Sequence, residues 1–356
     1  MRFLRLMPQR NSKRAAIWSK METTVFENPT IKQIERAAKA IRDGGLVVFP
    51  TETVFGLGAN ALDADAAKKI YAAKGRPSDN PLIIHLAKAD DAEKYAETND
   101  LYYALANRFM PGPLTVILPA KDIIPRTVTG GLDTVAVRVP IHKTANALIR
   151  AAGVPIAAPS ANISGKPSPT RTSHVICDMY GRADIILGGE ACDVGVESTI
   201  ITLCAEHPTL LRPGHVTLDE LREVCPDSVL SQAVLGKYEG QVLSPGMAYK
   251  HYAPKAAVTI VESDERKFYD YIPKGTETGI LCFDDDELLR TLPNVKIYGA
   301  SDDSSAQAKR LFECLREFDL EENITHIYAR KPSADGVGLA VLNRLLRAAG
   351  FNVVTL

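Results

Sequence analysis

The stretch LVVFPTETVFGLG, residues 46–58, decides the fold. Its first four residues are an apolar run that predicts a short buried strand, and Pro50 marks where that strand ends. Thr51, Glu52 and Thr53 follow at once. An apolar strand that ends in a polar loop is typical of α/β proteins, which place ligand sites outside strand ends. We therefore predict an α/β fold with a site at this strand end.

Helical and strand-like segments alternate unevenly around this stretch. Upstream, Thr30 and Gln33 form a capping-box pattern that begins a helix, and Gly44-Gly45 ends it. Downstream, a helix is expected from about Asp65 to Lys74, with Gly75 as its C-terminal cap. Further strands are expected at 82–86, 114–118, 135–139, 156–158, 185–187 and 199–203, and helices near 100–110, 143–152 and 171–181. The pattern predicts an α/β domain over residues 30–217, with a mixed sheet.

A second pattern begins at residue 256. Residues 218–255 are interpreted as a linker, with a short helix near 218–224 and the sequence Ser-Pro-Gly-Met at 244–247. Beyond it, strands are expected at 258–261, 279–283, 295–298, 326–329 and 353–356, with helices at 306–318 and near 339–349. This predicts a smaller, three-layer α/β domain over residues 256–356.

The first 29 residues differ from the rest in charge. Residues 1–20 hold six Lys or Arg residues and no acid. No long apolar segment or small-residue cleavage site follows, so we interpret residues 1–29 as a basic, disordered extension and a targeting sequence as the alternative.

Composition excludes several classes of protein. The net charge of -1 gives no overall attraction to polyanions, so phosphate must be met by local basic clusters. None of the six cysteines forms a CxxC pair and none of the seven histidines an HExxH motif, which argues against a zinc site. No apolar run approaches the ~18 residues of a membrane span. We expect a cytoplasmic protein with reduced cysteines and no membrane contact.

Two nucleotide-binding motifs fail on context. Residues 56–61 read GLGANA and fit the dinucleotide pattern, but five residues separate the strand end at Pro50 from Gly56, so the tight strand-to-helix turn is missing. Gly165-Lys166 is followed by Pro167, where a P-loop needs Ser or Thr.

Seven other segments each couple a strand end to a polar loop, namely residues 50–58, 74–77, 80–85, 137–140, 159–165, 197–199 and 211–214. Among them, Lys74 and Arg76 flank a glycine at a helix end. The helix dipole accounts for one cation there, but not for the Gly-Arg-Pro turn that leads into a buried strand. Because Lys supplies a point charge and Arg a forked donor, we favour a phosphate clamp over a solvated cap.

The remaining polar residues keep two interpretations each. Arg138 lies in an apolar strand, where it forms either a buried salt bridge or a clamp for a small carboxylate. Ser160 and Asn162 follow an apolar strand and either let a ligand approach the backbone or form an ordinary turn. His85 interrupts a strand, and a lone strand histidine is more often a core residue than a ligand contact.

Taken together, from about residue 30 to 215, these segments resemble the YrdC-like family, specifically the threonylcarbamoyl-AMP synthases. The KxR and SxN elements of that family appear here as Lys74 and Arg76 and as Ser160 and Asn162. The Ser-Pro-Gly-Met linker and a C-terminal α/β domain match its longer, two-domain form. The resemblance covers almost everything after the N-terminal extension.

The resemblance implies a fold and a reaction. The fold is a twisted mixed α/β sheet with a concave basic cavity, plus a smaller Rossmann-like, three-layer C-terminal domain. The reaction is that of a nucleotidyltransferase: L-threonine, bicarbonate and ATP give threonylcarbamoyl-AMP and pyrophosphate. The product passes to a tRNA threonylcarbamoyl transferase complex, which forms N6-threonylcarbamoyladenosine in tRNA. Mg²⁺ enters with ATP, and no protein side chain is assigned to a metal.

The resemblance also implies site residues by motif. The basic-polar set assigned to catalysis is Lys74, Arg76, Ser160 and Asn162. The threonine contacts are Thr53, His85, Arg138, Ala158 and Ser198. The ATP contacts are Arg76, Asn80, Thr134, Ser160, Ser168, Arg212 and Tyr249, the last in the linker. Phe55 stands where the family usually has Tyr, so the hydrogen bond of that hydroxyl is lost.

Three alternatives are weighed against this function. A double-stranded-RNA-binding module would use the basic concave face; the net charge and the lack of an RNA-stacking aromatic cluster argue against strong binding but leave a weak RNA contact open. Another carbamoyl-adenylate-forming enzyme, of the hydrogenase-maturation type, would carry cysteine pairs that are absent here. A regulatory protein with a ligand-sensing C-terminal domain is the third, although residues 256–356 show no candidate site.

Overall fold

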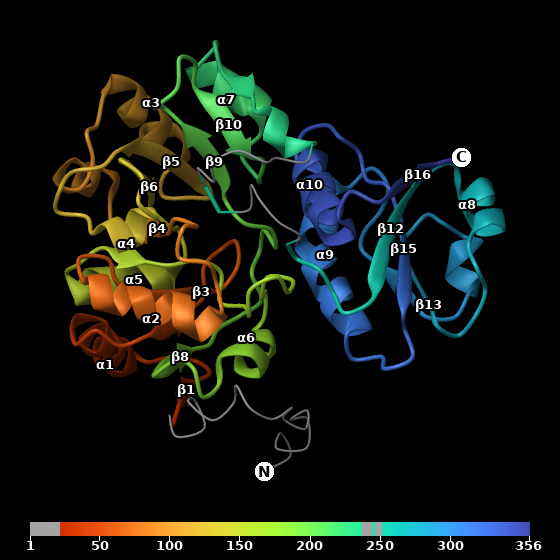
Figure 1. Ribbon diagram of the computed structural model, residues 1–356, viewed down its shortest axis with the longest axis horizontal. Coiled ribbons are helices and arrows are strands. Elements are labelled where there is room, and N and C mark those ends of the chain that lie inside the picture. Colours follow the sequence, from red (N-terminus) through yellow and green to blue (C-terminus); the bar gives the residue numbers. More distant parts are fainter. Residues whose placement is uncertain (1–21, 237–243, 246–250) are drawn as a thin grey trace.

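The computed structural model describes residues 22–236, 244–245 and 251–356. They form two α/β parts, one on each of two separate sheets, which lie side by side (Figure 1). We call the part that carries the first sheet the N-terminal domain and the part that carries the second sheet the C-terminal domain. The expected basic extension lies outside the described residues up to position 21.

The N-terminal domain is built on an 11-stranded mixed sheet, in the order β1-β8-β2-β3-β7-β4-β6-β5-β9-β10-β11. Every strand predicted between residues 82 and 203 is present within about two residues of its expected limits. The strands are β1 (Thr24–Phe26), β2 (Val47–Phe49), β3 (Gly56–Asn60), β4 (Ile83–His85), β5 (Leu114–Pro119), β6 (Thr134–Arg138), β7 (Ile156–Ala157), β8 (Ile185–Leu187), β9 (Thr199–Thr202), β10 (Thr209–Arg212) and β11 (Val229–Leu230).

Helices cover this sheet. They are α1 (Ile31–Arg42), α2 (Ala64–Lys74), α3 (Asp100–Phe109), α4 (Arg126–Thr129), α5 (Lys143–Ala152), α6 (Thr172–Met179) and α7 (Leu218–Val224), with short 3-10 helices at Ala89–Lys94 and Gln232–Val234. The capping box of Thr30 and Gln33 is confirmed, and so is the left-handed Gly75 that ends α2 at a φ of 64°. Packing of α1 against α5 forms one core, with Ile34 and Leu148 in it.

Strand alternation separates the main core from the site. Ile84, Val116 and Val137 point into the largest apolar core. Because successive strand residues face opposite sides, His85, Thr115 and Arg138 lie on the other face. Both faces are buried, which explains why these strands have nearly continuous apolar sequences.

Residues 56–60, for which no strand was predicted, form β3. This strand pairs antiparallel with β2, so the chain makes a hairpin around residues 50–55. The strand was not predicted because glycine has a low propensity for β-strands. They are needed here: a Cβ on Gly58 would lie 2.7 Å from Ile156 Cγ2 and 2.7 Å from Phe49 Cε1. The hairpin also confirms that the GLGANA sequence does not form a dinucleotide-binding turn.

Two further differences concern domain limits. Residues 24–26, expected in the disordered extension, form β1, which pairs in parallel with β8. Residues 229–230, expected in the linker, form β11, which extends the first sheet beside β10. Strands of two or three residues give no readable period in a sequence, so both were missed.

The C-terminal domain is a five-stranded parallel sheet in the order β14-β13-β15-β12-β16. Its expected strands and two main helices are confirmed, whereas α8 was missed. The elements are β12 (Ala257–Glu262), α8 (Glu265–Tyr271), β13 (Thr278–Cys282), β14 (Val295–Ile297), α9 (Ser304–Phe318), β15 (His326–Arg330), α10 (Gly338–Ala349) and β16 (Val353–Thr355), with a 3-10 helix at Leu289–Thr291. α9 and α10 pack on one face of the sheet and α8 on the other, which gives three layers.

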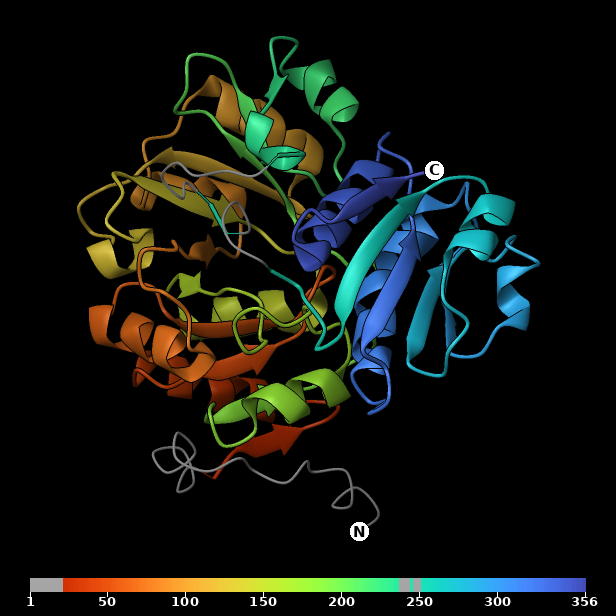
Figure 2. The ribbon, with the colours of Figure 1, turned by 45° about the vertical axis from the view of Figure 1, so that its right-hand side comes forward.

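Helices α9 and α10 lie between the second sheet and the N-terminal domain (Figures 1 and 2). Val54 and Val196 of the N-terminal domain belong to the same apolar cluster as the C-terminal core. Around this apolar contact, Arg316 of α9 pairs with Asp178 at 2.7 Å, and Arg344 of α10 with Glu197 at 2.9 Å. The two domains therefore share a buried interface of apolar and ionic contacts.

We predict that Gly58→Ala destabilises the protein by about 1–3 kcal/mol, because the added methyl group overlaps two buried side chains. Urea denaturation would measure this. Gly189→Ala is the matched control, since its Cβ would meet Pro50 Cγ at an ordinary 3.4 Å. An unchanged unfolding free energy in Gly58→Ala would show that the hairpin does not need this close approach.

Candidate functional site

A cavity opens beside the β2–β3 hairpin, on the sheet face opposite the main core. It is lined by strand ends, by the loops that follow them and by residues of the linker. The lining residues are Thr51, Val54, Phe55, Gly56, Arg76, Ile83, His85, Arg138, Ala158, Pro159, Ser160, Glu197, Ser198, Arg212, Pro245, His251 and Tyr252. It therefore collects residues from all seven of the segments in which a strand end is coupled to a polar loop.

Strand register brings the first polar residues together. β4 and β6 are parallel neighbours, and His85 lies directly opposite Arg138. On the other side of β6, Thr115 of β5 also pairs with Arg138. Because paired residues share a face, the three side chains form a row across the floor of the site.

Arg138 forms the buried salt bridge that was one of its two interpretations. Its Nη2 donates to Glu52 Oε1 at 2.6 Å, and both side chains are at least nine-tenths buried. The guanidinium keeps one unpaired hydrogen-bond donor, since Arg138 Nε has no partner among the described residues. An unpaired buried donor is costly, so the arrangement favours a ligand that accepts from it.

Arg76 and Arg212 supply positive charge elsewhere in the cavity. Arg76 donates to the carbonyl oxygens of Asn80 and Pro81, and Arg212 Nε donates to Ser198 O at 3.0 Å. Burial lowers the pKa of each guanidinium to about 10. Both pKa values stay well above 7, so both side chains remain cationic at neutral pH.

Lys74 lies beneath the loop of Ser160 and Asn162 and does not line the cavity. Its Nζ donates to Ser160 O and, at 2.6 Å, to Asn162 O. Ser160 Oγ donates to Asn162 Oδ1 at 2.5 Å. Burial, and then the charge of Arg76, lower the pKa of Lys74 well below its ordinary value. The structure thus joins Lys74, Ser160 and Asn162, with Lys74 holding the loop.

Glu197 and Ser198 connect three loops. Ser198 Oγ lies 2.8 Å from Thr115 Oγ1 and accepts from Arg212 Nη2 at 3.1 Å. Glu197 Oε1 accepts from Ser168 Oγ, and its Oε2 accepts from Arg344 of the C-terminal domain. The pKa of Glu197 is lowered although burial opposes this, because Arg344 and Arg212 lie near it.

His85 is a neutral hydrogen-bonding group. Burial, and then the charge of Arg138, lower the pKa of its imidazole to about 3. Its Nδ1 lies 3.3 Å from Ile156 O. Because a carbonyl oxygen only accepts, Nδ1 carries the proton, and Nε2 presents a lone pair.

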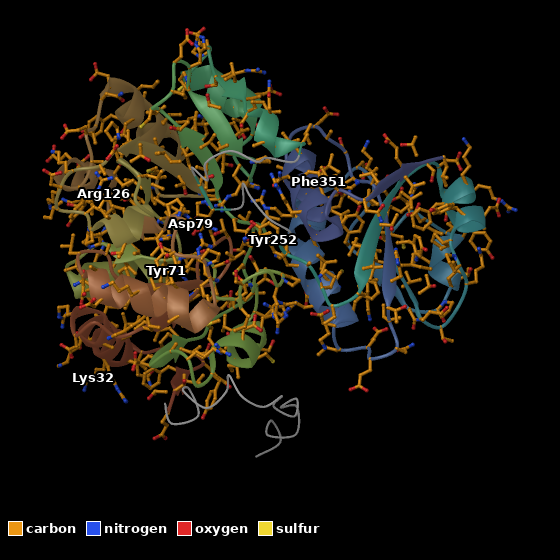
Figure 3. All side chains as sticks on the ribbon, viewed as in Figure 1. Lys32, Tyr71, Asp79, Arg126, Tyr252 and Phe351 are labelled. Carbon is orange, nitrogen blue, oxygen red and sulfur yellow. The ribbon has the colours of Figure 1, made fainter. Side chains whose placement is uncertain are left out.

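The linker contributes to the cavity through Pro245, His251 and Tyr252. Tyr252 lies at the junction of the two domains (Figure 3). Its ring is 5.2 Å from that of Phe312 in α9, and Arg344 lies 5.9 Å above it. Tyr249, the predicted ATP contact of this segment, lies outside the described residues.

The predicted residues fall into two groups. Seven line the cavity: Arg76, His85, Arg138, Ala158, Ser160, Ser198 and Arg212. Five others do not line it but hydrogen-bond to residues that do: Thr53, Lys74, Asn80, Asn162 and Ser168. Thr134, at the start of β6, does not line the cavity and pairs with Pro119. Phe55, where the resemblance implies a tyrosine, is among the lining residues, and its buried side chain belongs to the main apolar core.

Sequence reasoning missed Glu52, Glu197 and the role of Tyr252. Each acidic residue lay inside a selected segment, and buried arginines require such partners, so an unpaired Arg138 was the available signal. Nothing in the sequence pointed to Arg344, which comes from the other domain.

The acidic groups here offer little to a metal ion. Both oxygens of the one carboxylate that lines the cavity, Glu197, are already bonded to Ser168 and Arg344. In the described parts of the chain, His, Cys, Asp and Glu side chains do not gather in threes as metal ligands would. Nor does any helix there have the length and apolar character needed to span a bilayer.

Comparison with known proteins covers most of the chain. A family model described as "Telomere recombination" matches residues 39–214, and one described as "Threonylcarbamoyl-AMP synthase, C-terminal domain" matches residues 216–350. Together they cover both domains.

Relatives match at nearly full length. A threonylcarbamoyl-AMP synthase of Pyrococcus abyssi is 46% identical, over 90% of this chain and 95% of the relative, and one of Bacillus subtilis is 43% identical, over 90% and 94%. The crystal structure of P. abyssi Sua5 complexed with L-threonine has a TM-score of 0.86 at 44% identity, covering 94% of this chain and 99% of that one.

We predict that acid destabilises the protein through its buried histidines. Burial lowers the pKa of His85 to about 3, below the ~6.5 of an unfolded chain, so its neutral form stabilises the fold above pH 6.5, and this stability is lost as the pH falls. Between pH 7.5 and 5, the wild type should lose about 2 kcal/mol more than His85→Asn.

Urea denaturation at the two pH values measures this difference. His207→Asn is the control, because His207 is exposed, and it should keep the wild-type pH dependence. Equal losses in wild type and His85→Asn would mean that His85 is not held neutral by the fold.

Proposed function

Because the chain belongs to the two-domain threonylcarbamoyl-AMP synthase family, we propose that it is an L-threonylcarbamoyladenylate synthase. It joins L-threonine, bicarbonate and ATP and releases pyrophosphate. The observation that carries the proposal is the content of the cavity: Arg138, with an unpaired buried Nε, lies in the same space as Arg76 and Arg212. These suit a substrate carboxylate and a triphosphate.

The chemistry needs no nucleophile from the protein. The threonine amine attacks the carbon of bicarbonate, and water leaves, which gives a carbamate. A carbamate oxygen then attacks the α-phosphorus of ATP, and the bond to the β-phosphate oxygen breaks. Both reacting groups are anionic, so the protein contributes position and positive charge.

We assign the threonine side to the floor of the cavity. Arg138 binds the carboxylate through Nε, while Glu52 fixes the orientation of the guanidinium. The lone pair of His85 Nε2 accepts from the threonine hydroxyl. Ala158 and Ser198 complete the subsite. Thr53, which bonds Thr51 Oγ1 at 2.9 Å, supports the loop from behind.

The ATP side is assigned to Arg76, Ser160 and Arg212, with Asn80, Thr134 and Ser168 as supporting contacts. Arg76 and Arg212 neutralise the phosphates and stabilise the departing pyrophosphate. Lys74 and Asn162 shape the Ser160 loop from below rather than touching the phosphates, which modifies the expected role of Lys74.

Mg²⁺ belongs with the nucleotide in this proposal. The bonded oxygens of Glu197 do not fit a protein-held ion, so the ion enters as part of the Mg–ATP substrate. Hand-over of the product to a tRNA threonylcarbamoyl transferase complex, a cytoplasmic location and a weak RNA contact belong to the same proposal and rest on family membership alone.

We predict threonine-dependent release of pyrophosphate from ATP and bicarbonate. A site that hydrogen-bonds the hydroxyl should reject valine by at least about 100-fold in kcat/KM, and serine, which lacks one methyl group, by about 10-fold to 100-fold. Coupled pyrophosphate detection measures all three. RNA binding without release for any amino acid would support the RNA-binding alternative.

We also predict that Arg76→Ala lowers kcat/KM for ATP by at least about 10-fold, the size of a lost charged hydrogen bond. Its thermal midpoint should stay within a few degrees of wild type. Arg266→Ala is the control and should keep full activity, because the Arg266 side chain is exposed and does not line the cavity. Near-normal turnover in Arg76→Ala would refute the phosphate-binding role.

A further inference from the structure

We propose that Arg344 of the C-terminal domain is a positioning residue for the substrate site: it holds the loops that carry Ser168, Ser198 and Arg212. The inference rests on the proposed function, because those three residues are assigned to threonine and ATP there. It gives the C-terminal domain a defined part in the reaction, although none of the described residues that line the cavity belongs to that domain.

Arg344 contacts two loops of the N-terminal domain with all three of its nitrogens. Its Nε donates to Glu197 Oε2 at 2.9 Å, and its Nη2 donates to Glu197 O at 3.2 Å. Its Nη1 donates to Pro213 O at 2.6 Å. The guanidinium therefore binds both the side chain and the main chain of Glu197, and ties this residue to the loop after β10.

Each contact lies next to an assigned site residue. Glu197 precedes Ser198, and Pro213 follows Arg212. Through its other oxygen, Glu197 accepts from Ser168 Oγ. One side chain of α10 thus bonds directly to two segments of the site and reaches a third, that of Ser168, through Glu197.

Burial limits the positions that the Glu197 carboxylate can take. Arg344 is fully buried, and Glu197 is 6% exposed. Charges in such surroundings must be paired, so the Glu197 carboxylate has few other stable positions once Arg344 holds it. If Arg344 is lost, the carboxylate moves toward solvent or toward the nearby Arg212, and in either case the loop of Ser198 shifts.

Arg347 makes a similar contact with the N-terminal domain but does not bond to the loops that carry the assigned site residues. It lies three positions further along the same helix, is also buried, and also donates to the N-terminal domain, at 2.6 Å to Ala233 O. Ala233 belongs to a small apolar cluster and does not line the cavity. Arg347 is therefore a control for interface stability whose hydrogen bond goes to a residue outside the cavity lining.

The test uses the full-length protein with wild type, R344M, R344K, E197Q, R344M/E197Q and R347M. Thermal midpoints, KM and kcat for threonine and ATP, and threonine affinity by titration calorimetry are measured for each. We expect R344M to raise KM for threonine at least 10-fold, and R344K, which loses the forked geometry, to lie between it and wild type. R347M should lower the thermal midpoint as R344M does, yet keep KM within twofold.

Coupling separates positioning from general stability. Because Arg344 acts through Glu197, E197Q should change the threonine affinity of R344M far less than it changes that of wild type. Additive effects, or equal KM changes in R344M and R347M, would overturn the inference. If R344M does not fold, the changes in KM for threonine of R344K and E197Q are compared with that of R347M, and equal changes would again overturn the inference. A wild type without threonine-dependent turnover would instead overturn the proposed function.

Discussion

Uncompensated positive charge in a buried cavity is the constraint on which the rest of the structure depends. Lys74, Arg76, Arg138 and Arg212 are all buried around the site. The buried carboxylates near them include Glu52, Glu197 and Asp178, and Asp178 is paired with Arg316. Full pairing would remove the attraction for a triphosphate and a carboxylate, whereas no pairing would unfold the site. The pairing is partial: Glu52 aligns Arg138, Glu197 connects the loops, and carbonyl oxygens accept from the other cations. In the proposed function, the remaining charge meets the substrates.

Strand register and the β2–β3 hairpin bring the partially paired groups together. Parallel β4 and β6 set His85 against Arg138 in register, and the β2–β3 hairpin places Glu52 within reach of the same guanidinium. The hairpin closes only because Gly58 leaves room for Phe49 and Ile156. A local feature of the sequence therefore controls an electrostatic contact that spans 86 residues of chain.

Much of this was predictable, for identifiable reasons. Long periodic elements such as α1 and α2 carry caps that the sequence shows directly, and strand ends followed by polar loops located most of the cavity.

The failures of sequence-based prediction were of two kinds. Short or glycine-rich strands such as β1, β3 and β11 lack a readable period. Pairings such as Arg138 with Glu52 depend on tertiary contacts, so the sequence showed that Arg138 needed an acid but not which one. Thr53 and Lys74 were found by motif, yet they support the site from outside the cavity.

The position of the C-terminal domain follows from the same constraint. A buried carboxylate that links Ser168 to the Ser198 loop requires a cation, and Arg212 cannot be that cation if it is to meet phosphate. Supplying the charge from α10 leaves Arg212 available, and it ties the loop geometry to the docking of a second folded unit. Apolar contact of Val54 and Val196 with the second core excludes water from this pair, which strengthens it. The C-terminal domain thus provides the cation that Glu197 needs. No cation in the described part of the N-terminal domain is available for this pairing.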